Sequence, residues 1–151
     1  METTTRLREA TIADVPAIFA IRVSVRENSA TMENLYKHGI DEQMVAGAIT
    51  ASGRGWIVEE GGRAVGFSIA DQLEGSVFAL FVRPESKGRG YGGSLLDAAV
   101  QWLFAKGFDC VWLAVGRNTR PSLLLEALVG LRRAMQNRMA ILNWNFAAGF
   151  R

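Results

Sequence analysis

Cysteine and histidine are nearly absent from this chain of 151 residues, which contains one of each. The lone Cys110 excludes a disulfide within the chain and fits a reducing compartment, so we expect a cytoplasmic protein. The lone His38 leaves no Cys/His spacing that suits zinc. We therefore expect no metal site, and we interpret His38 as a loop residue.

The sequence also lacks a long apolar run. Residues Met1 to Arg8 are polar and do not resemble a signal peptide. No segment approaches the roughly 18 apolar residues that span a membrane. These absences predict that the protein has no membrane partner.

Charge of one sign is not in excess, because 17 basic side chains stand against 15 acidic ones. Nucleic-acid binding would need a clustered basic patch, and we expect no nucleic-acid partner. The length and a hydrophobic content of 49% predict one globular domain over residues 1–151. A nucleic-acid or scaffold role stays an alternative that rests only on Lys87, Arg89, Arg132, Arg133 and Arg138.

The first third of the chain reads as a strand followed by two helices. Arg6 to Ala10 is a strand candidate, and Asp14 caps a helix whose first turn holds Pro16. A second helix is predicted from Asp41 to a stop at Gly53. Between the helices, Glu27 to Gly39 reads as a polar connection. Apolar spacing in the first helix is carried by Val15, Ile18, Phe19 and Val23, with Arg22 among them.

From Trp56 the pattern changes to that of strands. Trp56 to Glu59, Ala64 to Ala70 and Val77 to Val82 are separated by short turns and predict an antiparallel meander. A helix from Gly92 to Lys106 follows, and Cys110 to Val115 is then a buried strand, parallel to its partner because a helix connects them. The predicted class is α/β (α+β), with a mixed, largely antiparallel central sheet flanked by helices.

The run Lys87-Gly88-Arg89-Gly90-Tyr91-Gly92-Gly93 lies between an apolar strand and an amphipathic helix. Glycines let the backbone turn its N–H groups inward, and the N-terminus of a helix attracts negative charge. A pyrophosphate would be held there mainly by main-chain donors, with Lys87 and Arg89 adding charge. The alternative is a plain glycine-rich turn before a helix.

Three of these glycines, at 88, 90 and 93, also satisfy the dinucleotide fingerprint G-x-G-x-x-G. In that fold the glycines follow the strand directly, and an acidic residue ends the next strand. Here Arg83 to Lys87 intervene, and Asp109 falls at the start of the next strand. A nicotinamide site is therefore a minor alternative.

The same segment resembles the signature of the GNAT superfamily of N-acetyltransferases, Gln/Arg-x-x-Gly-x-Gly/Ala after a strand and a short loop. This chain has Lys87-Gly88-Arg89-Gly90-Tyr91-Gly92, preceded by Ala79 to Glu85, with Lys instead of Gln or Arg at the first position. The resemblance covers Arg6 to about Arg120, with the elements in the same order.

The resemblance implies acetyl-CoA as co-substrate and a set of residues that hold it. The pantetheine arm would lie along the strand and the pyrophosphate over the glycine run. A further contact is expected from Asn118, whose alternative role is a helix cap before Pro121. The cofactor-binding candidates are thus Leu80, Phe81, Val82, Lys87, Gly88, Arg89, Gly90, Tyr91, Gly92, Gly93 and Asn118.

The reaction implied by the resemblance is attack of a substrate amine on the thioester. The oxyanion could be stabilised by the Val82 N–H, and Glu27 or Asp71 could act as base. The family often places Tyr where this chain has Leu125. A catalytically weak or inactive acyl-CoA-binding protein is therefore the second hypothesis.

The acceptor is expected to be a primary amine of a small molecule or peptide. A wall of acidic side chains would favour a cationic amine, and a homodimer is an assembly that the sequence leaves open. The acids expected on this wall are Glu27, Glu33, Asp41 and Glu42.

The composition changes after Glu126, because no acidic residue follows while four arginines do. GNAT chains usually end with a Gly-Trp pair and a hairpin such as Gly-Asp-Ile-Glu-Leu-Glu-Leu. If each codon's third base is read with the first two of the next codon, residues 139–146 are compatible with Gly-Asp-Leu-Glu-Leu-Glu-Leu. We therefore hypothesise a frameshift from about Arg120, which would also explain Leu125; the alternative is a divergent tail.

Overall fold

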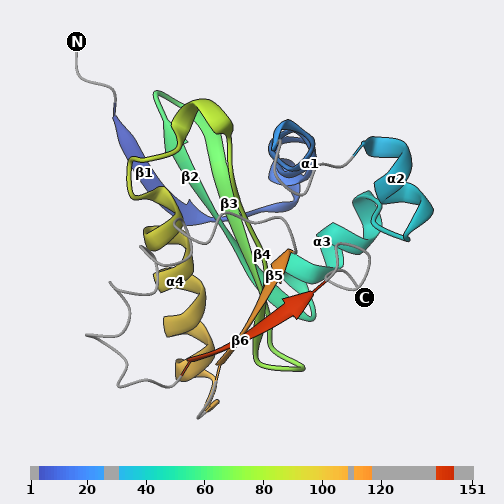
Figure 1. The fold of residues 1–151 in the computed structure, drawn as a ribbon, viewed down its shortest axis with the longest axis vertical. Coiled ribbons are helices and arrows are strands. Elements are labelled where there is room, and N and C mark those ends of the chain that lie inside the picture. Colours follow the sequence, from blue (N-terminus) through green and yellow to red (C-terminus); the bar gives the residue numbers. More distant parts are fainter. Residues whose placement is uncertain (1–3, 26–30, 109–110, 117–138, 145–151) are drawn as a thin grey trace.

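The chain forms one mixed sheet with the strand order β1-β2-β3-β4-β5-β6 (Figure 1). The structure is a computed structural model, and it describes residues 4–25, 31–108, 111–116 and 139–144. Neighbours from β1 to β4 are antiparallel, while β4 pairs with β5 and β5 with β6 in parallel. The predicted class is confirmed. The strands are β1 (Thr5–Glu9), β2 (Gly53–Glu60), β3 (Arg63–Asp71), β4 (Ser76–Val82), β5 (Val111–Gly116) and β6 (Met139–Trp144).

Helices cover both faces of the sheet (Figure 1). One face is covered by α4 (Tyr91–Ala105), whose apolar residues pack with Val77 and Val82. The other face is covered by α1 (Val15–Ser24) and α3 (Glu42–Thr50), which share a second core with Ala79. The residues of β4 therefore alternate between two cores, as expected of a central strand.

The polar connection predicted between the first two helices contains a helix, α2 (Met32–Lys37). Its start is capped by Thr31, whose Oγ1 accepts the N–H of Asn34 at 3.1 Å. Leu35 is fully buried. This helix was not predicted, because a short helix with one buried apolar residue leaves almost no periodic signal.

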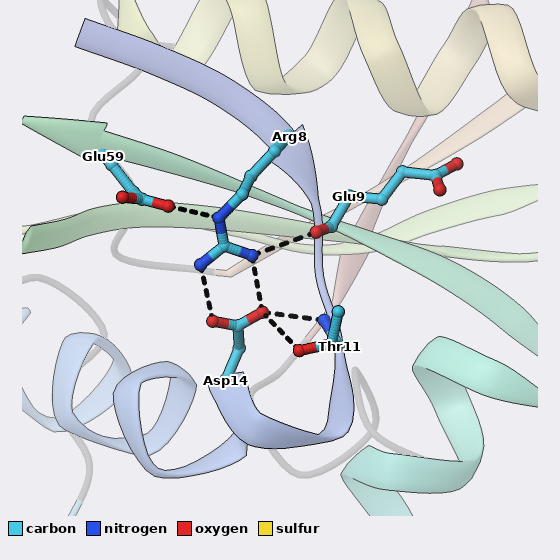
Figure 2. A network of polar contacts seen from close by, with 5 residues as sticks. All are labelled: Arg8, Glu9, Thr11, Asp14 and Glu59. Carbon is cyan, nitrogen blue, oxygen red and sulfur yellow. Dashed lines mark hydrogen bonds and ion pairs between the residues drawn. The ribbon is translucent and has the colours of Figure 1, made fainter. Parts of the chain in front are cut away.

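A polar network ties β1 to the start of α1 (Figure 2). Arg8 donates to both carboxylate oxygens of Asp14, at 2.8 and 2.7 Å, and also to Glu59 on β2. Asp14 stands at the N-cap of α1, as predicted, but its carboxylate accepts from Thr11 and not from the helix. It therefore closes a capping box around the 3-10 turn η1 (Ile12–Asp14).

The start of α4 is held close to β3. A Cβ at Gly66 would lie 3.0 Å from side-chain atoms of Leu95 and Val58, closer than most such contacts, so a larger residue there would have to displace them. Beside it, the buried Ser68 hydroxyl donates to the Leu95 carbonyl at 3.0 Å. These contacts fix the N-terminal half of α4 against the sheet next to β4.

Candidate functional site

The neighbouring strands β4 and β5 separate along the part of β4 that leads toward the glycine run. Among the residues that the structure describes, β4 and β5 pair only at Ser76 with Trp112 and at Val77 with Leu113. The β3–β4 register shifts between Ile69 and Ala70, which leaves Phe78 of β4 as the extra residue. Beyond this bulge, one edge of β4 is no longer paired with β5.

The backbone of Leu80 and Val82 faces that unpaired edge. Arg83 donates its N–H to the Val65 carbonyl at 2.7 Å, so its backbone groups point toward β3. The direction in which main-chain N–H and C=O groups point alternates from residue to residue along an antiparallel strand. The main-chain groups of Phe81 therefore also point toward β3, while those of Leu80 and Val82 point away from it. The polar main-chain groups of an extended ligand could pair with this edge as an added strand would.

The glycine run forms a turn that needs glycine at two positions. Gly88 and Gly90 have φ of 79° and 81°, in the left-handed region that other residues disfavour. A Cβ at either position would meet nothing within 4 Å, so space stays open above the turn. Between β4 and this turn lies the short 3-10 helix η2 (Pro84–Ser86).

The helix that follows presents its N-terminus to the same open space. Gly90 is the N-cap of α4, and its carbonyl accepts the N–H of Ser94 at 3.2 Å. The N–H groups of residues 91–93 precede the first full turn, so the helix offers them no carbonyl. Main-chain donors, a helix dipole and open glycines together make a site suited to a phosphate group. We refer to residues 87–93 as the cradle.

Two cradle side chains meet one acid at the end of β2. Glu60 Oε2 accepts hydrogen bonds from the Arg89 guanidinium and from the Tyr91 hydroxyl. The Tyr91 oxygen also lies 3.4 Å from Thr5 Oγ1 on β1. The hydrogen bonds from Tyr91 and Arg89 hold the pKa of Glu60 below its ordinary value. The sequence analysis did not find Glu60, because it lies 29 and 31 positions from its partners.

A buried arginine lies behind β4. Arg22 of α1 is 2% exposed, and its guanidinium carbon is 4.4 Å from the centre of the Phe81 ring. Burial lowers the pKa of Arg22 to about 10, so the side chain is still a cation at neutral pH. The sequence carried a signal for this arrangement, since a basic residue stood within the apolar stripe of the predicted helix. This contact puts a positive charge against one of the pantetheine candidates.

Of the two predicted bases, Asp71 is among the described residues and Glu27 is not. Asp71 ends β3, pairs with Ser76 and accepts the N–H of Leu73 at 2.9 Å. It therefore lies where β4 and β5 are still paired, roughly 20 Å along the strand from Val82 at about 3.3 Å per residue. Glu27 lies outside the described residues, as do Asn118 and Leu125. The catalytic assignments stay predictions.

Three acids predicted for the acceptor wall lie on α2 and α3 and are exposed. Glu33 is in the first turn of α2. Asp41 caps α3 by accepting the Met44 N–H at 2.8 Å, and Glu42 accepts the Tyr36 hydroxyl. Two of the three thus have structural partners of their own.

Two features are absent from the part of the chain that the structure describes. No helix in that part has the length and apolarity to cross a bilayer. No group of three or more His, Cys, Asp or Glu side chains among the described residues is placed to hold a metal ion.

Comparison with known proteins agrees with this geometry. The model of the acetyltransferase (GNAT) family matches residues 17–125, which include most of α1 and all of β4 and the cradle. The sheet is antiparallel from β1 to β4, so the doubly wound fold that the nicotinamide alternative needs is not present.

The individual relatives share either a short stretch of sequence or a low overall identity with this chain. A mycothiol acetyltransferase of Beutenbergia cavernae is 35% identical over 77 residues, which are 47% of this chain and 26% of that protein. The chain thus spans about a quarter of that relative's length. The ribosomal-protein-S18-alanine N-acetyltransferase of Escherichia coli has a TM-score of 0.64 at 18% identity, covering 84% of this chain and 77% of that one.

A third relative is the PaiA N-acetyltransferase of Thermoplasma acidophilum, solved in complex with coenzyme A. Its TM-score is 0.66 at 16% identity, covering 89% of this chain and 88% of that one. The two structural likenesses concern the fold, while the family match concerns the sequence over more than half of the chain. The chain therefore belongs to the acetyltransferase (GNAT) family, whose members are acyl-CoA-dependent N-acetyltransferases.

Proposed function

We propose that this protein binds acetyl-CoA and transfers the acetyl group to a primary amine of a small molecule or peptide. One observation carries the proposal: the open edge of β4 leads, through the short 3-10 helix η2, to a glycine cradle at the N-terminus of α4. An extended arm that ends in a pyrophosphate has the shape and charge that these two surfaces complement. The solved complex of the PaiA relative with coenzyme A supports this choice of ligand.

The residues present fit such a ligand. The edge groups of Leu80 and Val82 can pair with the amides of a pantetheine arm, while the glycines at 88 and 90 let phosphate oxygens approach the backbone. Lys87 and Arg89 add positive charge to the cradle. Asn118, which lies outside the described residues, is a further cofactor contact of the proposal.

Transfer requires a proton acceptor and an oxyanion donor. The amine must lose a proton to attack the thioester carbonyl, and the carbonyl oxygen gains negative charge as the new C–N bond forms. The Val82 N–H lies on the open edge of β4 and is our candidate donor to that oxygen. This donor belongs to the backbone, so substitution of the Val82 side chain should change the rate little.

For the base we propose Glu27, because the other predicted candidate, Asp71, lies roughly 20 Å along the strand from the oxyanion donor at Val82. Glu27→Gln should lower kcat by about 100-fold or more and leave the affinity for acetyl-CoA unchanged. Asp71→Asn and the control Glu74→Gln, at an exposed residue of the turn next to Asp71, should leave kcat unchanged. An unchanged kcat in Glu27→Gln would remove Glu27, and a loss of kcat in Asp71→Asn alone would restore Asp71 as the base.

A second candidate function is acyl-CoA binding with weak or no transfer. Leu125 favours it, because the family often has a Tyr there to reprotonate the leaving thiolate and leucine has no proton to give. Binding would persist in that case, since neither the cradle nor the open edge depends on residue 125.

Thiol release from acetyl-CoA distinguishes the two functions. The panel holds polyamines, aminoglycosides, amino acids and a peptide with an N-terminal alanine, the last because one relative is named for alanine of a ribosomal protein. We expect release that depends on an amine, with cationic amines preferred. Release that never exceeds hydrolysis without an amine, while CoA still binds, would establish the second function.

A further inference from the structure

We infer that Glu60 is a positioning residue that holds the cradle in its binding conformation. This inference rests on the proposed function, because the cradle is the proposed pyrophosphate site. Glu60 is the last residue of β2, the strand that lies between β1 and β3, and it is not part of the glycine run.

The carboxylate contacts the two residues on either side of Gly90. Its Oε2 accepts from the side chains of Arg89 and Tyr91, so a single acceptor bridges the turn. Tyr91 is 9% exposed and lies in the α4 core, whereas Arg89 is exposed. One end of this bridge is thus anchored in the core, and the other reaches the exposed part of the turn.

The turn needs such an anchor because of its glycines. Gly88 and Gly90 both have positive φ, and glycine has more conformations to lose than any other residue. Fixing the backbone of each such residue costs conformational entropy. A turn that is already ordered binds its ligand more tightly, because that ordering no longer opposes binding.

The negative charge of Glu60, in contrast, works against binding of a phosphate in the cradle. It neutralises Arg89 and would repel a phosphate, so removing it could tighten binding. Salt screens this repulsion between exposed charges. The bridge ties the turn to Tyr91, which is buried in the core, so we expect the ordering effect to decide the sign.

The test measures CoA affinity by calorimetry and acetyl-CoA kinetics by thiol release. Glu60→Ala should weaken CoA binding by about tenfold and raise the KM for acetyl-CoA similarly, and both effects should persist in 0.5 M salt. The kcat should stay within about twofold, because Glu60 touches no reacting atom. Glu60→Gln, which keeps an acceptor oxygen, should recover part of the affinity. Melting temperatures show whether each variant is folded.

Two further variants separate positioning from other effects. Glu85→Ala makes the same change in net charge, but the Glu85 carboxylate pairs with Arg63 at 3.6 Å and is not part of the bridge to Arg89 and Tyr91. It should leave CoA affinity unchanged. Tyr91→Phe should weaken CoA binding in the unaltered protein and have no further effect in Glu60→Ala, because both changes break the same bridge.

The outcomes are distinct. Unchanged or tighter CoA binding by a folded Glu60→Ala would overturn the positioning role, and tighter binding would identify Glu60 as a competing anion. Loss of kcat without a change in KM would overturn it as well. If the unaltered protein binds no CoA, the proposed function itself is wrong and this inference falls with it.

Discussion

Gly90 allows backbone conformation and charge to be tested separately. Its φ of 81° is tolerated best by glycine and next by Asn and Asp, which are nearly the same size. Gly90→Asp places a negative charge beside the proposed pyrophosphate, and Gly90→Asn places a neutral amide there. We predict that the Asp variant binds CoA at least about tenfold more weakly than the Asn variant, as measured by calorimetry in low salt.

The Asn variant is the control for strain and bulk. A side chain at Gly90 meets no atom within 4 Å, so both variants should fold. Equal affinities of the two variants would place the pyrophosphate away from Gly90 and contradict the cradle.

The sequence predicted the roles of residues that act through the conformation of their backbone. The glycines at 88 and 90 were predicted as a turn before a helix, and they have the positive φ that such a turn requires. Glu60 and Arg22 were not predicted as part of the site. Their partners lie tens of positions away, and which side chains meet across strands is decided by the register of the sheet.

At the scale of elements, the junction of β1 and α1 depends on the charge of Asp14 (Figure 2). The hydrogen bonds from Arg8 hold the pKa of Asp14 below its ordinary value, although burial opposes this shift. A carboxyl with a lowered folded pKa stabilises the protein above its unfolded pKa, about 3.9, and that stability is lost as the pH falls through the folded value. The junction should therefore weaken in acid.

We predict that Asp14→Asn lowers the free energy of unfolding by about 1–3 kcal/mol at pH 7, since the bidentate pair with Arg8 is partly buried. The difference from the unaltered protein should shrink below about pH 4, where Asp14 itself becomes protonated. Denaturant unfolding between pH 3 and 7 measures both. Glu9→Gln is the control, because the Glu9 carboxylate pairs with Arg54 in a more exposed pair, while the contact of Glu9 with Arg8 is made by the main-chain carbonyl and is kept. A pH-independent difference would contradict the role of the charge.

Elements with strong local signals were predicted closely. The helix expected from Gly92 to Lys106 is α4 (Tyr91–Ala105), and Gly107 follows it with a φ of 101°. The missed helix α2 has six residues, too few to show a period of 3.6. The strand β2 begins at Gly53, the residue expected to end a helix, because the backbone there pairs with Asp71 of β3.

At the scale of the whole molecule, the end of the chain departs from its family. The family match ends at residue 125, and β6 adds to β5 as a parallel strand from Met139 to Trp144. Leu125 lies inside the matched range, so the frameshift hypothesis no longer accounts for it. A change of frame would have to lie after residue 125 and not near Arg120.

We predict that the coding DNA, read in its alternate frame beyond codon 125, carries a Gly-Trp pair followed by Gly-Asp-Leu-Glu-Leu-Glu-Leu. Sequencing of the gene measures this directly. A protein with the restored frame should then show faster amine-dependent thiol release at unchanged CoA affinity, because the cradle precedes the change. A stop codon in the alternate frame, or a frame without this pattern, would end the hypothesis.

The central claim is that the open edge of β4 and the cradle form an acyl-CoA site. Isothermal titration of the unaltered protein with acetyl-CoA, CoA and NAD tests it most directly. We predict micromolar binding of acetyl-CoA and CoA at one site per chain, and no binding of NAD, because the fold lacks the parallel sheet that positions a dinucleotide. Binding of NAD without binding of acetyl-CoA or CoA would contradict the account.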